Sequence, residues 1–310
     1  MEQNNNSAGL LDRLRGKVRL RANPAIITIF GDTVLPHGGE IWLGSLIALA
    51  APLGIAPRLV RTGVYRLSQQ GWLTSRKQGR RAYYTIAEQS MDKFAEATRR
   101  FYAMENAPWD GEWRLVQLPS DISASRRHAL VRELGWLGFG QIGPALYAHP
   151  TETTATIART LARHKLSDRA FVFRAHLAEF VSGEHVHRVA KQAWNLSALK
   201  QDYERFIAAF SPIGETLADG APICEEDAYA LRILLMLEHR RILLKDPVLP
   251  AALLPEDWLG PAALELTANI YRRIVPAADR FLLSNLETWS GSVPPPPPEY
   301  WQRFGGLKAA

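Results

Sequence analysis

The stretch "APRLVRTGVYRLSQQGWLTSRKQGRRAYYTIA", residues 56–87, changes its hydrophobic period halfway along and so predicts two kinds of structure. In its first half Val60, Val64 and Leu67 recur at helical spacing, which puts them on one face of a helix. The second half alternates apolar and polar residues around the Gln-Gly pair 78–79, which indicates a β-hairpin with its turn there. A helix followed at once by a basic hairpin is therefore expected.

Two further helices are predicted before this stretch. The segment "PAIITIFGDTVL" suits a helix beginning at Pro24, since proline is tolerated in a first helical turn. After the loop "PHGGE", the segment "IWLGSLIALAAPLG", residues 41–54, suits a second helix that stops before Pro52 and Gly54. Three helices followed by a hairpin is the order of a winged helix-turn-helix domain, which we place at residues 24–88.

The outer face of the third helix and the hairpin are basic, and no aspartate or glutamate occurs between Glu40 and Glu88. The planar fork of arginine matches guanine edges and phosphates, and glutamine pairs with base edges. We predict double-stranded DNA as the partner, because a helix-turn-helix fits the DNA major groove better than the narrow groove of duplex RNA. The predicted DNA-binding residues are Arg58, Arg61, Thr62, Tyr65, Arg66, Gln69, Arg76, Lys77, Arg80 and Arg81.

A basic N-terminal arm, residues 1–23, extends this pattern. Its basic residues are Arg13, Arg15, Lys17, Arg19 and Arg21, opposed by Asp12. Such arms commonly lie along the DNA backbone or in a minor groove. The simpler alternative is that these charges only solvate an amphipathic surface, but helix order, hairpin and missing acids agree in favouring DNA.

The central region, residues 109–182, alternates between strand-like and helix-like patterns. Strands are predicted at "EWRLVQLP", "PALYAHP" and "RAFVFRAHLA", and helices at "SASRRHALVRELGWLG" and "TETTATIARTLARHKL". With a strand pair between the two helices, this order suits a ferredoxin-like α/β sandwich. The expected fold class of the chain is α+β.

The remaining segments are expected to be mostly helical. A linker helix is placed at 89–108 and a helical C-terminal domain at 183–290, where three segments show apolar spacing of three and four residues. The tail, residues 291–310, contains five consecutive prolines that enforce extended backbone and end any helix.

The composition excludes several classes of protein. The 310 residues include 47% hydrophobic and 22% charged residues, as in globular proteins, and the net charge of +6 points to anionic partners. No signal-peptide pattern and no sufficiently long apolar run occurs, so we expect a cytoplasmic protein without a membrane span. The single cysteine, Cys224, excludes an internal disulfide, and its acidic neighbours should raise its pKa and keep it inert.

Three further motifs do not support chemistry. "GFGQIG" at 138–143 matches a dinucleotide-binding pattern but closes a helix instead of opening one. "HGGE" at 37–40 resembles an oxyanion loop, but the chain lacks the nucleophile elbow that this role requires. His185 and His187 lack a third ligand at recognisable spacing. We predict no catalytic residue, no metal ligand and no cofactor.

A family resemblance covers nearly the whole chain. The segment "ITIFGDTVLPHGGEIWLGSLIALAAPLGIAPRLVRTGVYRLSQQGWL" resembles the N-terminal domain of the PaaX repressors of phenylacetate catabolism. "ELGWLGFGQIGPALYAHP" and "LEHRRILLKDPVLPAALLPEDWLGPAAL" resemble that family's central and C-terminal regions. The resemblance implies a homodimeric transcriptional repressor, not an enzyme, that is released from a dyad-symmetric operator by an aryl-acetyl-CoA, typically phenylacetyl-CoA. We expect the helical C-terminal domain to serve dimerisation and effector binding.

An alternative function rests on the central domain. In this family that domain is also similar to a small CRISPR-associated ferredoxin-like nuclease, so a metal-dependent nuclease or an RNA-binding protein is the alternative. Such a nuclease needs an aspartate at the end of its first strand to hold a metal. Here "WRLVQLP" ends without one, and Asp121 comes only after Pro119 and Ser120. Catalysis by this domain is therefore not expected.

The cluster "LEHRRILLKDP" supplies the candidate effector contacts. Arg240 and Arg241 are predicted to meet the phosphates of an acyl-CoA effector. The structural alternative is that they pair with acids across the helical domain or face water, since surface ion pairs are common and individually weak.

Overall fold

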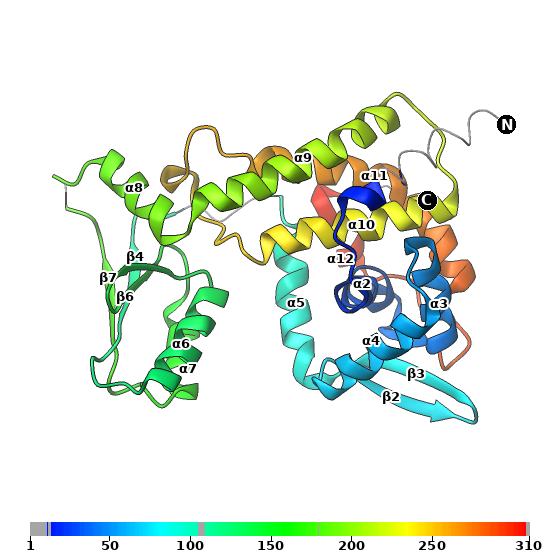
Figure 1. Cartoon of the computed structure of the whole chain (residues 1–310), viewed down its shortest axis with the longest axis horizontal. Helices are drawn as coiled ribbons and strands as arrows, with labels where there is room; N and C mark the ends of the chain where they lie inside the picture. Colours follow the sequence, from blue (N-terminus) through cyan, green and yellow to red (C-terminus); the bar gives the residue numbers. More distant parts are fainter. Residues whose placement is uncertain (1–10, 12–13, 105–108, 179, 308–310) are drawn as a thin grey trace. The chain divides into compact units, whose positions relative to one another are not determined.

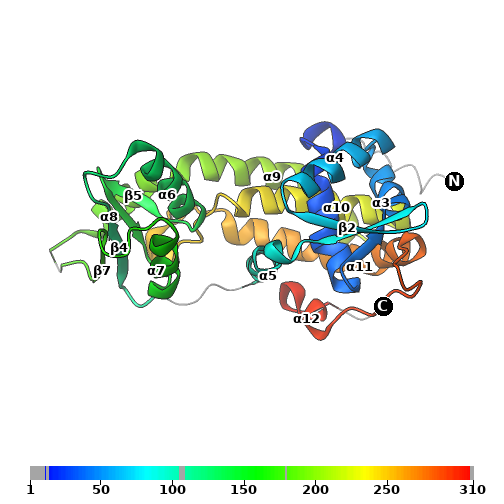
Figure 2. The same ribbon diagram turned by 90° about the horizontal axis from the view of Figure 1, so that it is seen from below.

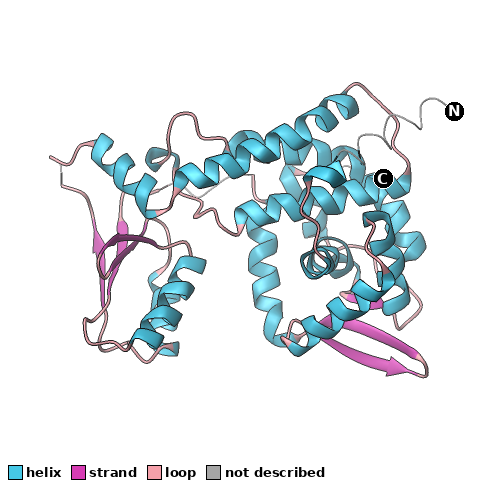
Figure 3. Ribbon diagram, in the orientation of Figure 1, coloured by secondary structure: helices cyan, strands magenta, loops and turns pink. Residues whose placement is uncertain are grey.

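The computed structural model describes residues 11, 14–104, 109–178 and 180–307 (Figure 1). The chain forms two compact units. The first contains the described residues of 1–104, 205–240 and 262–310, and the second those of 105–204 and 241–261. Helices predominate, and each unit contains one small antiparallel sheet (Figure 3). The expected α+β class is thereby confirmed.

Three helices form the N-terminal part of the first unit. They are α2 (Ala22–Ile29), α3 (Leu43–Ala50) and α4 (Pro57–Gln69). Helix α2 continues through a π-helical turn at Phe30–Val34 and a 3-10 turn at Leu35–His37, and α3 is followed by a 3-10 turn at Ala51–Leu53. Their apolar faces meet in one core, in which Ile26, Leu46 and Val60 are completely buried. This burial holds the three helices together.

A three-stranded antiparallel sheet completes this part. Its strands are β1 (Glu40–Trp42), β2 (Leu73–Gln78) and β3 (Arg81–Ile86), in the order β1-β3-β2. The hairpin β2–β3 ends with Gln78 opposite Arg81, and Gly79 in its turn has φ +58°. Glycine adopts this left-handed conformation without the steric cost that other residues meet. The predicted hairpin is present, beside α4 (Figure 1), although Gln78 is still paired in β2 and the turn consists of Gly79 and Arg80.

The predicted second helix is wrong for its first two residues. Ile41 and Trp42 belong to β1, where they pair with Tyr84 and Tyr83 of β3, and α3 begins only at Leu43. Strand β3 lies more than forty positions later, so this pairing is invisible to a local pattern. Backbone pairing and complete burial of Ile41 outweigh the local helical spacing.

Long helices make up most of the C-terminal half. They are α5 (Glu88–Tyr102), α9 (Leu196–Ala218), α10 (Glu225–Leu243), α11 (Gly260–Asn285) and the short α12 (Pro298–Trp301), with a 3-10 turn at Arg303–Gly305. Figures 1 and 2 show α9, α10 and α11 running alongside one another. Their contacts include the tilted ring pair of Tyr229 and Phe281. The proposed C-terminal segments are thus helical, although α9 is separated from the preceding helix α8 at Asn195, which has φ +48°.

The second unit is built on a four-stranded antiparallel sheet. The strands are β4 (Trp113–Gln117), β5 (Gly140–Gly143), β6 (Leu146–His149) and β7 (Phe171–Ala175), in the order β5-β6-β4-β7. The helices of this unit are α6 (Ala124–Trp136), α7 (Thr154–Arg163) and α8 (Gly183–Ala193), with a 3-10 turn at Ala251–Leu253. Strand β5 is the short extra strand expected between the two helices. It lies at one edge of the sheet, and β7 lies at the opposite edge.

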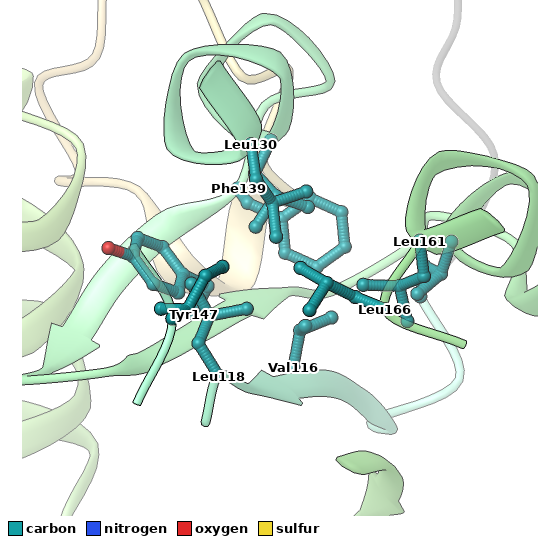
Figure 4. Packing of buried hydrophobic residues seen from close by; sticks show 10 residues of the cluster. Val116, Leu118, Leu130, Phe139, Tyr147, Leu161 and Leu166 are labelled. Atoms are coloured by element: carbon teal, nitrogen blue, oxygen red, sulfur yellow. The ribbon is translucent and has the colours of Figure 1, made fainter. Parts of the chain in front are cut away.

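The two faces of this sheet carry separate apolar layers. On one face Val116 and Leu118 meet Leu130 of α6 and Leu161 of α7 (Figure 4). On the other, Trp113 and its neighbours pack with α8 and the segment around the 3-10 turn; the buried members are Trp113, Ala148, Leu196, Leu249 and Leu253. Strand alternation therefore positions both layers. Among the described helices, none combines the length and the apolar character needed to cross a bilayer.

Candidate DNA-binding surface

The buried face of α4 is fixed closely against α2. Val60, Val64 and Leu67 are buried, as their spacing predicts. Gly63 lies on the same side, where an added Cβ would stand only 2.5 Å from Cδ1 of Ile26. The small residue permits this close approach, which leaves the opposite face of α4 to solvent.

The solvent face of α4 holds six of the predicted DNA contacts. Arg58, Arg61, Thr62, Tyr65, Arg66 and Gln69 are all exposed. Within the described part of the chain, no ion pair engages any of the three arginines of this face. Their guanidinium groups therefore keep donors available for an anion from outside the molecule.

The tip of the β2–β3 hairpin offers two more cations. Arg80 lies in the turn and Lys77 lies two residues before it, next to Gln78. Both are exposed, and no ion pair among the described residues engages either of them. The flexible stems of these side chains suit contact with a repeating phosphate backbone better than recognition of single bases.

Arg76, in the middle of β2, is held within the chain. Its Nε and Nη2 both donate to Oε2 of Glu40, at 2.8 and 2.5 Å. Its guanidinium also lies 4.2 Å from the ring centre of Trp289, within cation–π range.

Arg81 is held in the same way. It forms an ion pair with Glu287 and lies 4.7 Å from the ring centre of Trp42. Its hydrogen bond with Tyr83 and the charge of Glu287 raise the pKa of the guanidinium. Among the described residues, the hairpin thus carries two arginines with acidic partners, Arg76 and Arg81, and two cations without them, Lys77 and Arg80, a distinction that the sequence does not reveal.

Part of the basic arm lies outside the described residues, including Arg13. Arg15 donates from Nη2 to the carbonyl of Pro52 at 2.6 Å, which ties it to the end of α3. Lys17, Arg19 and Arg21 are exposed.

In the same unit as the candidate DNA-binding surface, Asp32 forms the centre of a buried charged cluster. Nε of Arg232 lies 2.5 Å from Oδ2 of Asp32, and Nη1 of Arg303 donates to its main-chain carbonyl at 2.9 Å. The hydroxyls of Tyr102 and Tyr271 both donate to Oδ1. Burial alone would raise the pKa of Asp32, but the two arginines and the two hydroxyls lower it overall. Asp32 is therefore an ionised, fully bonded acid.

A second acid completes the cluster. Asp279 of α11 lies 2.5 Å from Nη1 of Arg232 and accepts a hydrogen bond of 2.7 Å from the hydroxyl of Tyr300. The guanidinium of Arg303 stacks over the Tyr300 ring at 4.6 Å. The cluster joins the end of α2 to α10, α11 and the C-terminal tail, all within the first unit.

Sequence reasoning missed this cluster, although a signal was present. Asp32 is the one charged residue in "PAIITIFGDTVL", and Arg232 stands alone in the apolar run "AYALRILLML". A single charge inside an apolar helix must find a partner when it is buried. The pattern predicts that a partner exists, but not that it lies 200 positions away.

The predicted effector contacts lie in different surroundings. Arg240 is half-buried, donates from Nη1 to Oγ1 of Thr28 at 3.3 Å and lies 6.0 Å from the ring centre of Phe101. Burial lowers its pKa. Arg241 is exposed. Arg240 belongs to the first unit and Arg241 to the second. Their role stays a prediction.

Among the described residues, the glycine and histidine motifs rejected from the sequence form no catalytic or metal-binding site. Gly138 takes φ +87° before β5, and Gly38 takes φ +91° before β1, so both serve turns. His187 bonds through Nε2 to the carbonyl of Ala252 at 2.9 Å, while His185 contacts Arg188. No group of three or more potential metal ligands occurs among the described residues.

The structure also shows the surroundings of Asp121 and Cys224, the acid and the thiol considered from the sequence. Asp121 pairs with Arg169, beyond the end of β4. Cys224 is exposed, and partial burial and the acids Asp227 and Glu226 raise its pKa. The thiol is therefore not activated, although it is not buried.

Comparisons with known proteins agree along the chain. Residues 21–90 match the family described as PaaX-like protein, 106–188 the PaaX protein central Cas2-like domain, and 194–284 the PaaX-like protein C-terminal domain. The transcriptional repressor PaaX of Escherichia coli strain K12 is 36% identical over 283 residues, which cover 91% of this chain and 89% of that protein.

One solved structure supports the fold alone. The uncharacterized protein Rv0674 from Mycobacterium tuberculosis superposes with a TM-score of 0.53 at 19% identity, covering 84% of this chain and 98% of that one. The three family matches and the E. coli relative confirm the resemblance seen in the sequence. This chain belongs to the PaaX-like protein family.

Proposed function

We propose that this chain is a DNA-binding transcriptional repressor of an aromatic, phenylacetate-type catabolic operon. The family is one of transcriptional regulators and not of enzymes. The observation that carries the proposal is the exposed face of α4, whose arginines have no acidic partner among the described residues. Action on DNA would take place in the cytoplasm.

The N-terminal part of the first unit acts as a winged helix-turn-helix in this proposal. Three helices, the hairpin β2–β3 and the sheet order β1-β3-β2 support it. Helix α4 enters the major groove, where Arg58, Arg61, Arg66 and Gln69 meet base edges or phosphates, beside Thr62 and Tyr65. The hairpin is the wing and lies along the backbone, with Lys77 and Arg80 at its tip.

The sheet of the second unit is proposed to be a ferredoxin-like sandwich. Its elements run strand, helix, two strands, helix, strand, and the order β5-β6-β4-β7 places the first and third strands of this series in the middle. The domain limits 24–88, 109–182 and 183–290 stay predictions. A nuclease or RNA-binding role is the less favoured alternative, because β4 ends without a carboxylate and Asp121 is engaged by Arg169.

The active unit is proposed to be a homodimer. We expected the helical C-terminal domain to supply the interface, but strand β7 is the better candidate. It is an edge strand, and Phe171 and Phe173, stacked on each other, are 66% and 47% exposed. Two copies pairing through the same edge strand generate a two-fold axis, as a dyad-symmetric operator requires.

A substitution on this edge tests the dimer. Phe171→Glu should give a monomer in light scattering, while Phe180→Glu, which changes an exposed phenylalanine outside the strand, should leave a dimer. A dimeric Phe171→Glu variant would move the interface back to the helical region.

The proposed effector is an aryl-acetyl-CoA, with phenylacetyl-CoA as its typical form. Ligand and DNA would each weaken the binding of the other by the same factor, commonly equivalent to about 1–3 kcal/mol. Arg240 and Arg241 are the proposed contacts for its phosphates. Operator binding titrated separately with phenylacetyl-CoA, phenylacetate and CoA tests this step, since release should occur with the thioester alone.

The experiment that tests the function itself is selection of bound DNA from a random pool. A dyad-symmetric duplex consensus would support a dimeric repressor. Enrichment of a single-stranded RNA motif from a parallel pool, without a DNA consensus, would favour the RNA-binding alternative.

A further inference from the structure

After α11 ends at Asn285, the chain folds back onto the proposed winged domain. The N–H of Glu287 donates to Oγ of Ser45 at 3.0 Å, and the N–H of Trp42 donates to the carbonyl of Glu287 at 2.9 Å. We call residues 286–304 the C-terminal strap. Its first residues are thus hydrogen-bonded to the end of β1 and the start of α3.

The side chains of the strap contact the wing arginines. Glu287 pairs with Arg81 through its carboxylate. The N–H of Trp289 donates to Oε1 of Glu40 at 2.7 Å, and Oε2 of the same carboxylate holds Arg76. The ring of Trp289 covers the guanidinium of Arg76 and forms an edge contact with Tyr83, with ring centres 5.3 Å apart.

The strap is also attached further along its length. His37 contacts the carbonyl of Pro294 through Nδ1 at 3.0 Å. Near the end of the strap, Arg303 is buried and bonded to Asp32. These attachments keep the segment from Glu287 to Trp289 beside the wing.

The groups that hold the two wing arginines are those that a DNA phosphate would replace. A carboxylate and a phosphate both accept from the same edge of a guanidinium. Yet Arg76 and Arg81 remain 54% and 52% exposed, so a phosphate can reach them. An acid that already occupies such an edge competes directly with the DNA backbone.

We propose that the C-terminal strap is an autoinhibitory contact, in which Glu287 competes with DNA phosphates for Arg81 while Trp289 helps Glu40 of β1 to hold Arg76. This inference rests on the proposed DNA-binding function. While the strap is in place, the wing offers mainly Lys77 and Arg80 to DNA. When the strap yields, Arg81 loses its acidic partner and becomes available to DNA, whereas Arg76 keeps its ion pair with Glu40 of β1. The affinity for any duplex then rises.

The first test is the charge-only change Glu287→Gln, which keeps both main-chain hydrogen bonds of residue 287. It should bind a mixed-sequence duplex several-fold more tightly than the wild type. The slope of log K against log[salt] should steepen by about 0.9, as expected for one more neutralised phosphate. The matched control is Glu265→Gln, which removes one exposed negative charge of α11 away from the wing.

A double-mutant comparison separates the strap from general electrostatics. Arg81→Ala should weaken binding several-fold in the Glu287→Gln background and much less in the wild type, because Arg81 is already occupied there. Equal losses in both backgrounds, or a Glu287→Gln variant no tighter than the Glu265→Gln control, would overturn the autoinhibitory role. Weaker binding by Glu287→Gln would also overturn it, since Glu287 would then orient Arg81 for DNA.

Hydrogen exchange supplies an independent measurement. Addition of the duplex should accelerate exchange of the amides of Trp42, Glu287 and Trp289, which bond within this contact, while α4 becomes slower. Slower exchange at α4 without acceleration in the strap contradicts the inference and leaves the DNA-binding proposal intact. A wild-type protein that binds no duplex at all would instead refute the proposed function, and the strap inference with it.

Discussion

Two groups of arginines in the first unit have the same chemistry and opposite surroundings. Arg58, Arg61 and Arg66 on α4 are exposed, and no acid among the described residues pairs with them. Arg232 and Arg303 are buried and bonded to the Asp32 cluster. The difference shows that an arginine's task is set by the acid that reaches it in the folded chain. Arg76 and Arg81 lie between these extremes, because each is paired with an acid and is still about half-exposed.

The largest expected effect comes from the buried group. Asp32→Asn keeps the shape of the side chain but leaves two buried guanidiniums short of a negative charge. We expect it to lower the free energy of unfolding in urea by about 3–5 kcal/mol. DNA binding should fall only as far as the folded fraction falls.

The matched control is the surface pair of Glu225 and Arg280, whose side chains are both about half-exposed. Glu225→Gln should cost less than about 1 kcal/mol. If Asp32→Asn and Glu225→Gln lowered the free energy of unfolding by the same amount, the contrast between buried and exposed arginines would have no effect on stability.

The next effect is the dependence of the unfolding free energy on pH, which arises from His239, buried in the same unit. Complete burial lowers the pKa of His239 to about 4, against the ordinary value of 6.5, so the folded state keeps the ring neutral. As pH falls below 6.5 the unfolded chain binds this proton first, and stability is lost until the folded pKa is reached. Between pH 7 and 4 the loss from this group should be about 3 kcal/mol.

His239→Gln checks the assignment, because glutamine can still donate to the carbonyl of Phe101 but does not titrate. Denaturation across this pH range should show a flatter dependence of the unfolding free energy than in the wild type. An unchanged dependence would assign the acid sensitivity to other groups, such as His37, whose pKa burial also lowers.

Substitution of the exposed α4 arginines should lower operator affinity and leave the free energy of unfolding nearly unchanged. Arg61→Ala and Arg66→Ala should each weaken operator binding by about 1–3 kcal/mol and relax base preference, because each would remove a proposed bidentate pair of hydrogen bonds to a base. Their unfolding free energies should stay within about 0.5 kcal/mol of the wild type. Arg273→Ala removes an exposed charge elsewhere in the same unit and serves as the control. Unchanged operator affinity in both α4 variants would end the assignment of α4 as the recognition helix.

The smallest effect is expected at the wing tip. Lys77→Ala and Arg80→Ala should weaken all duplexes about equally, and each should reduce the salt slope by about 0.9. Titrations at several salt concentrations with operator and mixed-sequence DNA measure this. A selective loss for the operator would show that the tip reads sequence.

Local patterns were sufficient for much of the fold. The apolar spacing of Val60, Val64 and Leu67 predicts α4, and alternation around Gly79 predicts the hairpin, because both depend only on neighbouring residues. The assignment of Ile41 and Trp42 to a helix was wrong because β3, which pairs with them, lies far along the chain. Long-range pairing overrides local preference in such cases.

The same limit applies to the candidate site. Exposure of the α4 arginines follows from helical period and could be predicted. Capture of Arg81 by Glu287, 206 positions away, could not, because no local pattern encodes which acid arrives there. The difference between the hairpin cations that have an acidic partner and those that have none among the described residues is therefore a property of the folded chain.

The position of Arg303 has a consequence for synthesis of the protein. Asp32 is made early, and its partner at residue 303 follows 271 positions later. At ~5–20 residues per second, the ribosome needs roughly 15–55 s to deliver that partner. Arg232 is made earlier and supplies one cation for Asp32, but the contact with Arg303 forms only after residue 303 has been made, so the last step in folding this cluster waits until then. A chain that stopped before residue 303 would lack these contacts, and the Asp32 cluster would stay incomplete.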